Sequence, residues 1–132
     1  MQEGSNDVVL DYSPHEKEIA ELLEKEFGGE IYMVPRVNNP KEISTPDYVF
    51  RNMLFDLKAI TGKGKNVLYD AISKKKRQSP NFIFDLTKCP LGDTEIQNQI
   101  KSIYRSGHTK FVDILILVKG GRISCVMKRA KK

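Results

Sequence analysis

Three charged residues in the first half of the chain have the types and the spacing needed to cleave a phosphodiester bond. Asp47 follows a proline, and nine positions later the chain reads Asp56-Leu57-Lys58. Because side chains alternate between the two faces of a β-strand, we expect Asp56 and Lys58 to project from one face. Carboxylate oxygens suit a divalent cation, and a lysine can orient water or neutralise charge that grows on a phosphate. The spacing predicts a phosphodiesterase site.

The residues around Asp56 and Lys58 indicate that neither face of this strand is exposed to solvent. Leu54 and Ile60 share their face, and apolar residues also fill the opposite face. Charges in such a setting should be paired, and a metal with its substrate would pair them. The alternative is structural. An aspartate after a proline is a common turn residue, and an Asp-Lys pair on an exposed strand is often only solvated charge.

A third carboxylate lies on the first helix that the sequence predicts. Ser13 has the type of an N-cap, Pro14 suits the first helical position, and a glycine pair at 28–29 ends the helix. On a helical wheel Glu16 falls inside the apolar stripe, where an unpaired charge is costly. Glu16 therefore either closes a capping box with Ser13 or lies beside a metal or a bound water.

Two short segments resemble a known nuclease motif. Pro46-Asp47 and Asp56-Leu57-Lys58 look like the PD-(D/E)xK motif of the restriction-endonuclease-like superfamily. The order of a Glu-bearing helix, a Pro-Asp hairpin, Asp-x-Lys, a basic helix and the strand at 81–86 is similar to the C-terminal tRNA-nuclease domains of contact-dependent growth inhibition (CdiA) toxins. The resemblance runs from about residue 13 to residue 127. It implies a metal-dependent nuclease toxin that has a cognate immunity protein.

The resemblance also implies roles for single residues. Asp47 and Asp56 would bind Mg²⁺ or Mn²⁺, Glu16 would lie beside the metal, and Gln78, which ends the basic helix, would belong to the active-site region. tRNA is the favoured substrate. Beyond the resemblance, His108 follows a glycine and precedes a core strand, so it is a candidate general acid or phosphate contact. A capping or packing histidine is the alternative for His108.

The charge of the chain favours a polyanionic partner. The net charge is +5 and the isoelectric point about 9.2. Two basic groups follow the Asp-x-Lys strand, and we expect nucleic acid to lie across them: Lys63, Lys65, Lys74, Lys75, Lys76 and Arg77. Each run could also be an ordinary solvated face. The chain shows no aromatic RNA-binding signature, so the sequence itself does not separate RNA from DNA. A DNase of the same fold and a non-catalytic basic binding module remain the alternatives.

Other chemistries have weak support. Cys89, Cys125 and the two histidines lack the spacing of a zinc site, and Ser13 and His15 with distant acids make no convincing hydrolase triad. Asp85 and Asp113 lie in apolar segments, where we expect backbone or basic partners rather than a metal.

The size and composition fit one domain without a membrane segment. The chain has 132 residues, of which 39% are hydrophobic and 30% charged, and no apolar run is long enough to cross a bilayer. The first residues do not resemble a signal peptide. If the domain is a toxin, we expect a larger exported protein or a particle to deliver it to the cytoplasm of a target cell. We expect a monomer when it is free.

The pattern of the whole chain predicts an α/β (α+β) fold with a restriction-endonuclease-like core, in which helices flank a central mixed β-sheet. The predicted order is α-β-β-β-α-β-α-β-β. Residues 1–12 are expected to be flexible, residues 13–132 to form the nuclease domain, and a basic tail to begin at about 128. Asp93 or Thr94 is expected to cap the third helix, and a nearly continuous apolar run predicts a central strand at 111–118.

Overall fold

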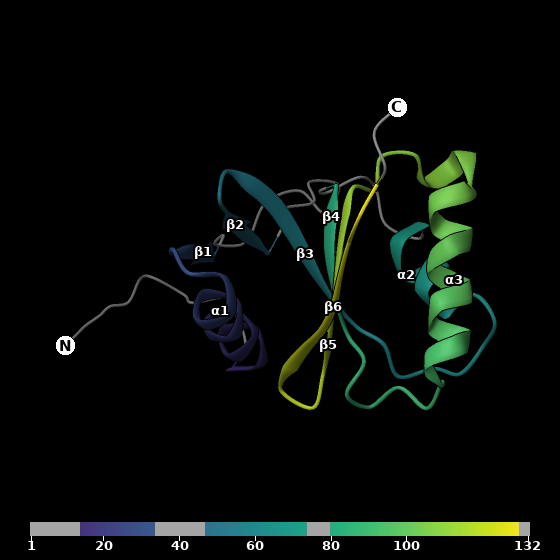
Figure 1. The fold of residues 1–132 in the computed structure, drawn as a ribbon, viewed down its shortest axis with the longest axis horizontal. Coiled ribbons are helices and arrows are strands. Elements are labelled where there is room, and N and C mark those ends of the chain that lie inside the picture. The colour runs from purple at the N-terminus through teal and green to yellow at the C-terminus, as the bar shows by residue number, and fades with distance from the viewer. Residues whose placement is uncertain (1–13, 34–46, 74–79, 130–132) are drawn as a thin grey trace, which may run out of the picture.

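A six-stranded mixed sheet runs through the middle of the molecule, and helices cover both of its faces (Figure 1). The computed structural model describes residues 14–33, 47–73 and 80–129. The elements follow one another as α1 (Pro14–Phe27), β1 (Ile31–Met33), β2 (Tyr48–Phe50), β3 (Met53–Ala59), α2 (Val67–Ser73), β4 (Asn81–Asp85), α3 (Asp93–Arg105), the short 3₁₀ helix η2 (Gly107–Thr109), β5 (Ile114–Lys119) and β6 (Arg122–Lys128). The predicted order of helices and strands is confirmed.

The strands lie in the sheet in the order in which they occur in the chain. β1, β2 and β3 are antiparallel, β3, β4 and β5 are parallel, and β6 is antiparallel to β5. In the parallel part, Ala59 pairs with Asp85, and Asp85 pairs with Val118. The carboxyl ends of β3, β4 and β5 therefore meet at one edge of the sheet.

The turn between β2 and β3 sets the register of the hairpin. Arg51 and Asn52 both have positive φ, 53° and 63°, and Phe50 pairs with Met53. Two left-handed residues suit the right-handed twist of a two-residue hairpin, even though neither is glycine. From the sequence, this register is uncertain by a residue or two. The observed register pairs Tyr48 with Phe55. Asp47, which precedes Tyr48, therefore lies beside Asp56, which follows Phe55.

Two hydrophobic cores fill the two faces of the sheet. α1 packs on one face through Ile19, Ala20 and Leu23, and α2 and α3 pack on the other (Figure 1). The alternation of β4 shows the division, because Ile83 belongs to the α1 core while Phe82 and Phe84 belong to the other core.

The same alternation assigns the faces of β3. Phe55 packs in the α1 core, whereas Asp56 and Lys58 pair in register with Phe82 and Phe84. Asp56 and Lys58 therefore project from the face of the sheet that α2 and α3 cover. They share one face, as the sequence predicted.

Two predictions about element ends are wrong. Gly92, not Asp93 or Thr94, is the N-cap of α3, and no side chain caps this end. Asp93 instead lies in the first turn, where its charge favours the helix dipole. The strand expected from residue 111 begins at Ile114, because the chain first forms η2 and a turn.

Arg129 explains the path of this turn. Its guanidinium donates hydrogen bonds to the backbone oxygens of Val112 (2.7 Å), Tyr104 (3.0 Å) and Thr109 (3.0 Å), and it lies over the ring of Tyr104. Three backbone oxygens of residues 104–112 thus bind one guanidinium, which fixes the path of this segment. β6 also extends to Lys128, so residues 128 and 129 belong to the fold rather than to a tail. The other residues of the expected tail, and residues 1–12, lie outside the described residues.

Within the described ranges, no helix is long and apolar enough to cross a membrane.

Candidate functional site

The backbone of β3 holds Asp47 at the start of the hairpin. The amide of Asp47 donates to the oxygen of Phe55 (3.0 Å), and the Asp47 carboxylate accepts a hydrogen bond from the amide of Leu57 (2.7 Å). These two bonds straddle Asp56. They extend the β2–β3 pairing by one residue and place Asp47 beside Asp56, as the predicted site requires.

Asp56 is a buried carboxylate with an incomplete set of partners. It is only 4% exposed. Lys58 Nζ lies 3.0 Å from Asp56 Oδ2, which makes an ion pair, but no hydrogen-bond donor is directed at that oxygen within the described residues. A buried carboxylate oxygen normally has such a donor. Among the described residues, Oδ2 is therefore paired with the Lys58 ammonium, in an ion pair that lacks good hydrogen-bond geometry.

The pKa of Asp56 reflects this environment. Burial raises it most, and the hydrogen bond and negative charge of Asp47 raise it further, while Lys58 lowers it; the result is a pKa of about 7. Two carboxylates that close together cannot both carry a charge cheaply, so they tend to share a proton near neutral pH. A divalent cation relieves the same repulsion. The donor set of Asp47 and Asp56 therefore fits a hard metal ion such as Mg²⁺ or Mn²⁺.

Glu16 does not complete a cluster with these two residues. It is buried in the first turn of α1, and Tyr48 Oη donates to its backbone oxygen (2.6 Å). α1 packs on the face of the sheet opposite to Asp56. Within the described ranges, no three His, Cys, Asp or Glu side chains form a group that could hold a metal. The metal role of Glu16 stays a prediction.

The remaining predicted site residues are placed apart from Asp56 or lie outside the described residues. Lys63 and Lys65 are exposed on the loop that follows β3. His108 is exposed in η2, where its backbone amide donates to Ser106 Oγ (3.2 Å). The described structure does not include the following residues: Lys74, Lys75, Lys76, Arg77 and Gln78.

A buried glutamine that the sequence analysis did not single out holds the basic loop. Gln99 of α3 accepts a hydrogen bond from the amide of Leu68 (3.1 Å) and donates one to the oxygen of Gly64 (3.0 Å). It is 3% exposed. Gln99 thus fixes the start of α2 and the loop that carries Lys63 and Lys65. The sequence offered one sign of this role, because Gln99 is a polar residue on the apolar face of a predicted helix.

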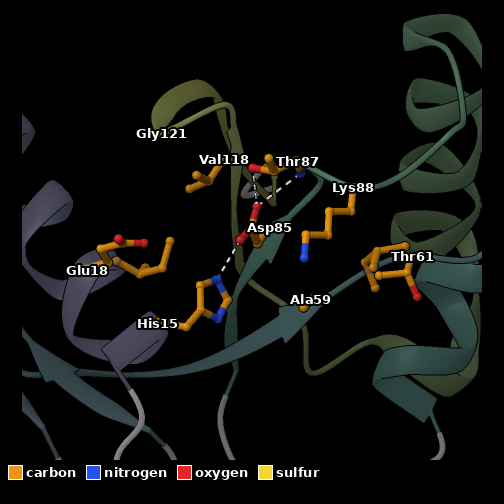
Figure 2. A pocket seen from close by; sticks show the side chains of 11 residues that line it. His15, Glu18, Ala59, Thr61, Asp85, Thr87, Lys88, Val118 and Gly121 are labelled. Atoms are coloured by element: carbon orange, nitrogen blue, oxygen red, sulfur yellow. Dashed lines mark hydrogen bonds and ion pairs between the residues drawn. The ribbon is translucent and has the colours of Figure 1, made fainter.

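A second constellation, on the α1 face, was also missed. A cavity of about 520 Å³ lies between the start of α1 and the carboxyl ends of the parallel strands. Figure 2 shows the side chains that line it. His15 Nε2 lies 2.6 Å from Asp85 Oδ2. The other oxygen of Asp85 accepts hydrogen bonds from the amide (3.0 Å) and hydroxyl (2.6 Å) of Thr87. The sequence analysis assigns a catalytic role to neither His15 nor Asp85.

These bonds determine the charge of Asp85. Burial alone would raise its pKa, but the hydrogen bonds from Thr87 and His15 outweigh burial and hold the pKa below its usual value. The expectation that Asp85 has backbone and basic partners is confirmed. No local pattern indicates the pairing, because His15 and Asp85 are 70 positions apart.

Comparisons with known proteins agree on one relationship. A family model described as "Contact-dependent growth inhibition CdiA C-terminal domain" matches residues 44–123. The chain is also similar to a solved structure described as "CdiA-CT/CdiI toxin and immunity complex from Burkholderia pseudomallei". That similarity has 25% sequence identity and a TM-score of 0.64, and it covers 86% of this chain and 82% of the other. No curated protein matches the chain.

Proposed function

Because the chain belongs to the family of contact-dependent growth inhibition CdiA C-terminal domains, we propose that it is a toxin domain that hydrolyses phosphodiester bonds with a divalent metal. The arrangement of Asp47, Asp56 and Lys58 supports this proposal most directly. It unites two carboxylates and an amine at one place on the sheet, and it leaves a buried carboxylate oxygen without a hydrogen-bond donor from the described residues.

Each of the three residues has a role that follows from its surroundings. Asp47 and Asp56 would hold Mg²⁺ or Mn²⁺, which when bound supplies a Lewis acid and a more acidic water. Lys58 forms an ion pair with Asp56, and its ammonium can orient that water or neutralise charge that develops on the phosphate. The backbone amide of Leu57 keeps Asp47 pointed at the site.

The substrate class rests on charge and on family. The net charge of +5 and the exposed Lys63 and Lys65 beside the end of β3 favour a nucleic acid. The relatives' toxin role makes a cellular RNA a suitable target, and tRNA is the substrate that we propose. DNA is the alternative for the same chemistry.

One experiment separates these possibilities. The purified domain is incubated with total tRNA and, separately, with plasmid DNA, in Mg²⁺, in Mn²⁺ and in EDTA. We expect cleavage of tRNA in metal and a large loss of that cleavage in EDTA. Cleavage of plasmid alone would replace tRNA with DNA, and no metal-dependent cleavage of either would overturn the proposal.

A binding measurement tests the metal site without relying on activity. Mg²⁺ or Mn²⁺ should raise the melting temperature of the wild-type domain, because a ligand that binds only the folded state stabilises it. Asp56→Asn should abolish this shift. Asp93→Asn, which changes an exposed aspartate on α3, is the matched control and should keep it.

We also propose a cognate immunity protein and delivery as part of a larger exported protein. The similar structure from Burkholderia pseudomallei is described as a toxin and immunity complex. A basic substrate surface favours an acidic partner that blocks it. The product of the neighbouring gene should bind this domain and protect cells that express it. A domain that is harmless in cells without any such neighbour would contradict the toxin role.

A further inference from the structure

The cavity on the α1 face has the features of a second reaction site. It lies on the side of the sheet opposite to Asp56, because Asp85 projects from β4 on the same face as Ile83 of the α1 core. Its walls come from α1, from the ends of β3, β4 and β5, and from the turn that leads into β6 (Figure 2). A concave site with a few converging polar groups is where ligands usually bind.

His15 and Asp85 are arranged as an oriented base. Thr87 holds one oxygen of Asp85 through two hydrogen bonds, and the other oxygen is 2.6 Å from His15 Nε2. Thr87 Oγ in turn accepts a hydrogen bond from the amide of Gly120 (3.0 Å). Asp85 is therefore fixed by groups from its own strand end and from the β5–β6 turn, and it can fix the histidine ring.

The hydrogen bond assigns the tautomer of His15. An ionised Asp85 accepts a hydrogen bond from Nε2–H, so the neutral ring has its lone pair on Nδ1. Figure 2 shows this second nitrogen pointing away from Asp85. The His15 side chain is 40% exposed, so substrate can reach it. An imidazole held in one tautomer by a partly buried aspartate is suited to act as a general base.

The nucleophile must come from the substrate. Thr61 and Thr87 line the cavity, but neither hydroxyl is hydrogen-bonded to His15 in the described structure. An RNA strand brings its own hydroxyl, at the 2′ position. Lys88 lies at one side of the cavity and Glu18 at the other (Figure 2). A negatively charged phosphate would therefore bind on the side of the positive Lys88, away from the negative Glu18.

We propose that this cavity binds RNA and that His15 is the general base of a cleavage reaction that needs no metal. His15 Nδ1 takes the proton of the 2′-hydroxyl, and the 2′-oxygen forms a bond to phosphorus. The bond from phosphorus to the 5′-oxygen breaks, and that oxygen leaves with its electron pair and takes a proton from water. The imidazolium then returns its proton to the solvent. Lys88 neutralises the phosphate, and Asp85 is a positioning residue.

The products distinguish this reaction from the metal-dependent one. Attack by the 2′-hydroxyl leaves a 2′,3′-cyclic phosphate and a 5′-hydroxyl, and it cannot occur on DNA. A short RNA and its all-2′-deoxy counterpart are incubated with the domain in EDTA, and the ends are identified by mass spectrometry. We expect cyclic phosphate ends from the RNA and no cleavage of the deoxy strand.

Substitutions assign the reaction to the cavity. His15→Gln keeps a donor for Asp85 and removes the base, so it should lower the EDTA-resistant rate by about 10²- to 10⁴-fold. Asp93→Asn changes an exposed aspartate on α3, which packs on the other face of the sheet, and should have no effect. Asp85→Asn should lower kcat with little change in KM, because an amide can donate a hydrogen bond to Nε2 and so favours the wrong tautomer of the ring.

Several outcomes would overturn the proposal. They are an absence of cyclic phosphate ends, an EDTA-resistant rate that His15→Gln leaves unchanged, and an Asp85→Asn variant that raises KM while kcat stays at the wild-type value. Asp56→Asn separates the two sites. It should remove the metal-dependent products while the cyclic phosphate ends persist, so failure at one site is recognised independently of the other.

Discussion

Asp56 and Asp85 lie on neighbouring parallel strands, yet their surroundings move their pKa values in opposite directions. Burial raises the pKa of Asp56 to about 7, Asp47 adds a like charge, and one oxygen has no hydrogen-bond donor from the described residues. Asp85 has three donors, from Thr87 and His15, and its pKa is lowered. The number of donors directed at a carboxylate, more than burial alone, decides its charge. Asp56 thus has a raised pKa beside Lys58, whereas the donors around Asp85 stabilise its ionised form beside His15.

The largest expected effect is on metal-dependent cleavage. Asp56→Asn should reduce its rate by several orders of magnitude, on the order of 10³-fold or more, because a metal ligand is removed. Asp85→Asn should leave this rate within a few-fold of wild type. Initial rates on tRNA in Mg²⁺, less the rates in EDTA, measure both. Equal losses in the two variants would show that the two regions are not chemically separate.

The two carboxylates should also differ in how they affect stability. The folded-state pKa of Asp56, about 7, exceeds its ordinary value of 3.8. Its contribution to stability is therefore fully present below pH 3.8 and is lost as pH rises through 7. In EDTA, Asp56→Asn should gain about 2–4 kcal/mol relative to wild type between pH 4 and pH 8. Urea unfolding at both pH values measures this change, and a difference that does not depend on pH would contradict it.

Asp85 should show the opposite dependence. Its folded-state pKa lies below 3.8, so its contribution is present above that pH and is lost as pH falls through the folded-state value. Asp85→Asn should cost about 1–3 kcal/mol at pH 7, because hydrogen bonds to a charged acceptor are weakened. The cost should shrink in acid. Thermal unfolding from pH 2.5 to 7 tests this, and a cost that grows in acid would refute the assignment.

The smallest expected effect is on substrate binding. Lys63→Ala with Lys65→Ala should weaken tRNA binding several-fold, and it should lower the slope of log affinity against log salt by about 0.7 for each phosphate that is no longer neutralised. Lys25→Ala with Lys101→Ala removes the same charge from two exposed helix positions and is the control. Equal effects of the two pairs would mean that only net charge matters.

The sequence was informative where local rules apply. Caps, turns and periodicity predicted the element order, and strand alternation predicted that Asp56 and Lys58 share a face. The proximity of Asp47 and Asp56 could be predicted because they lie on the two arms of one hairpin, which a short turn joins. Their catalytic roles stay predictions.

The other region depended on contacts that no local rule supplies. His15 meets Asp85 only because α1 packs across the sheet, and Arg129 holds Val112 only after β6 has paired with β5. Single polar residues at such positions look like ordinary capping or surface residues in the sequence. Their partners become visible only once the helices and strands are packed.

The strand order of the sheet bears on how the chain can acquire its structure. Among the described residues, each strand pairs only with its neighbours in the sequence, from β1 to β6. No strand has to be inserted between two that have already paired, so the sheet can grow by adding strands at one edge as the chain becomes available. The parallel pairings, such as Phe55 with Asn81 and Phe82 with Leu115, still close long loops that contain a helix, so they should form more slowly than the β2–β3 and β5–β6 hairpins. The strand order thus allows the described strands to pair from β1 to β6 in the order of the sequence.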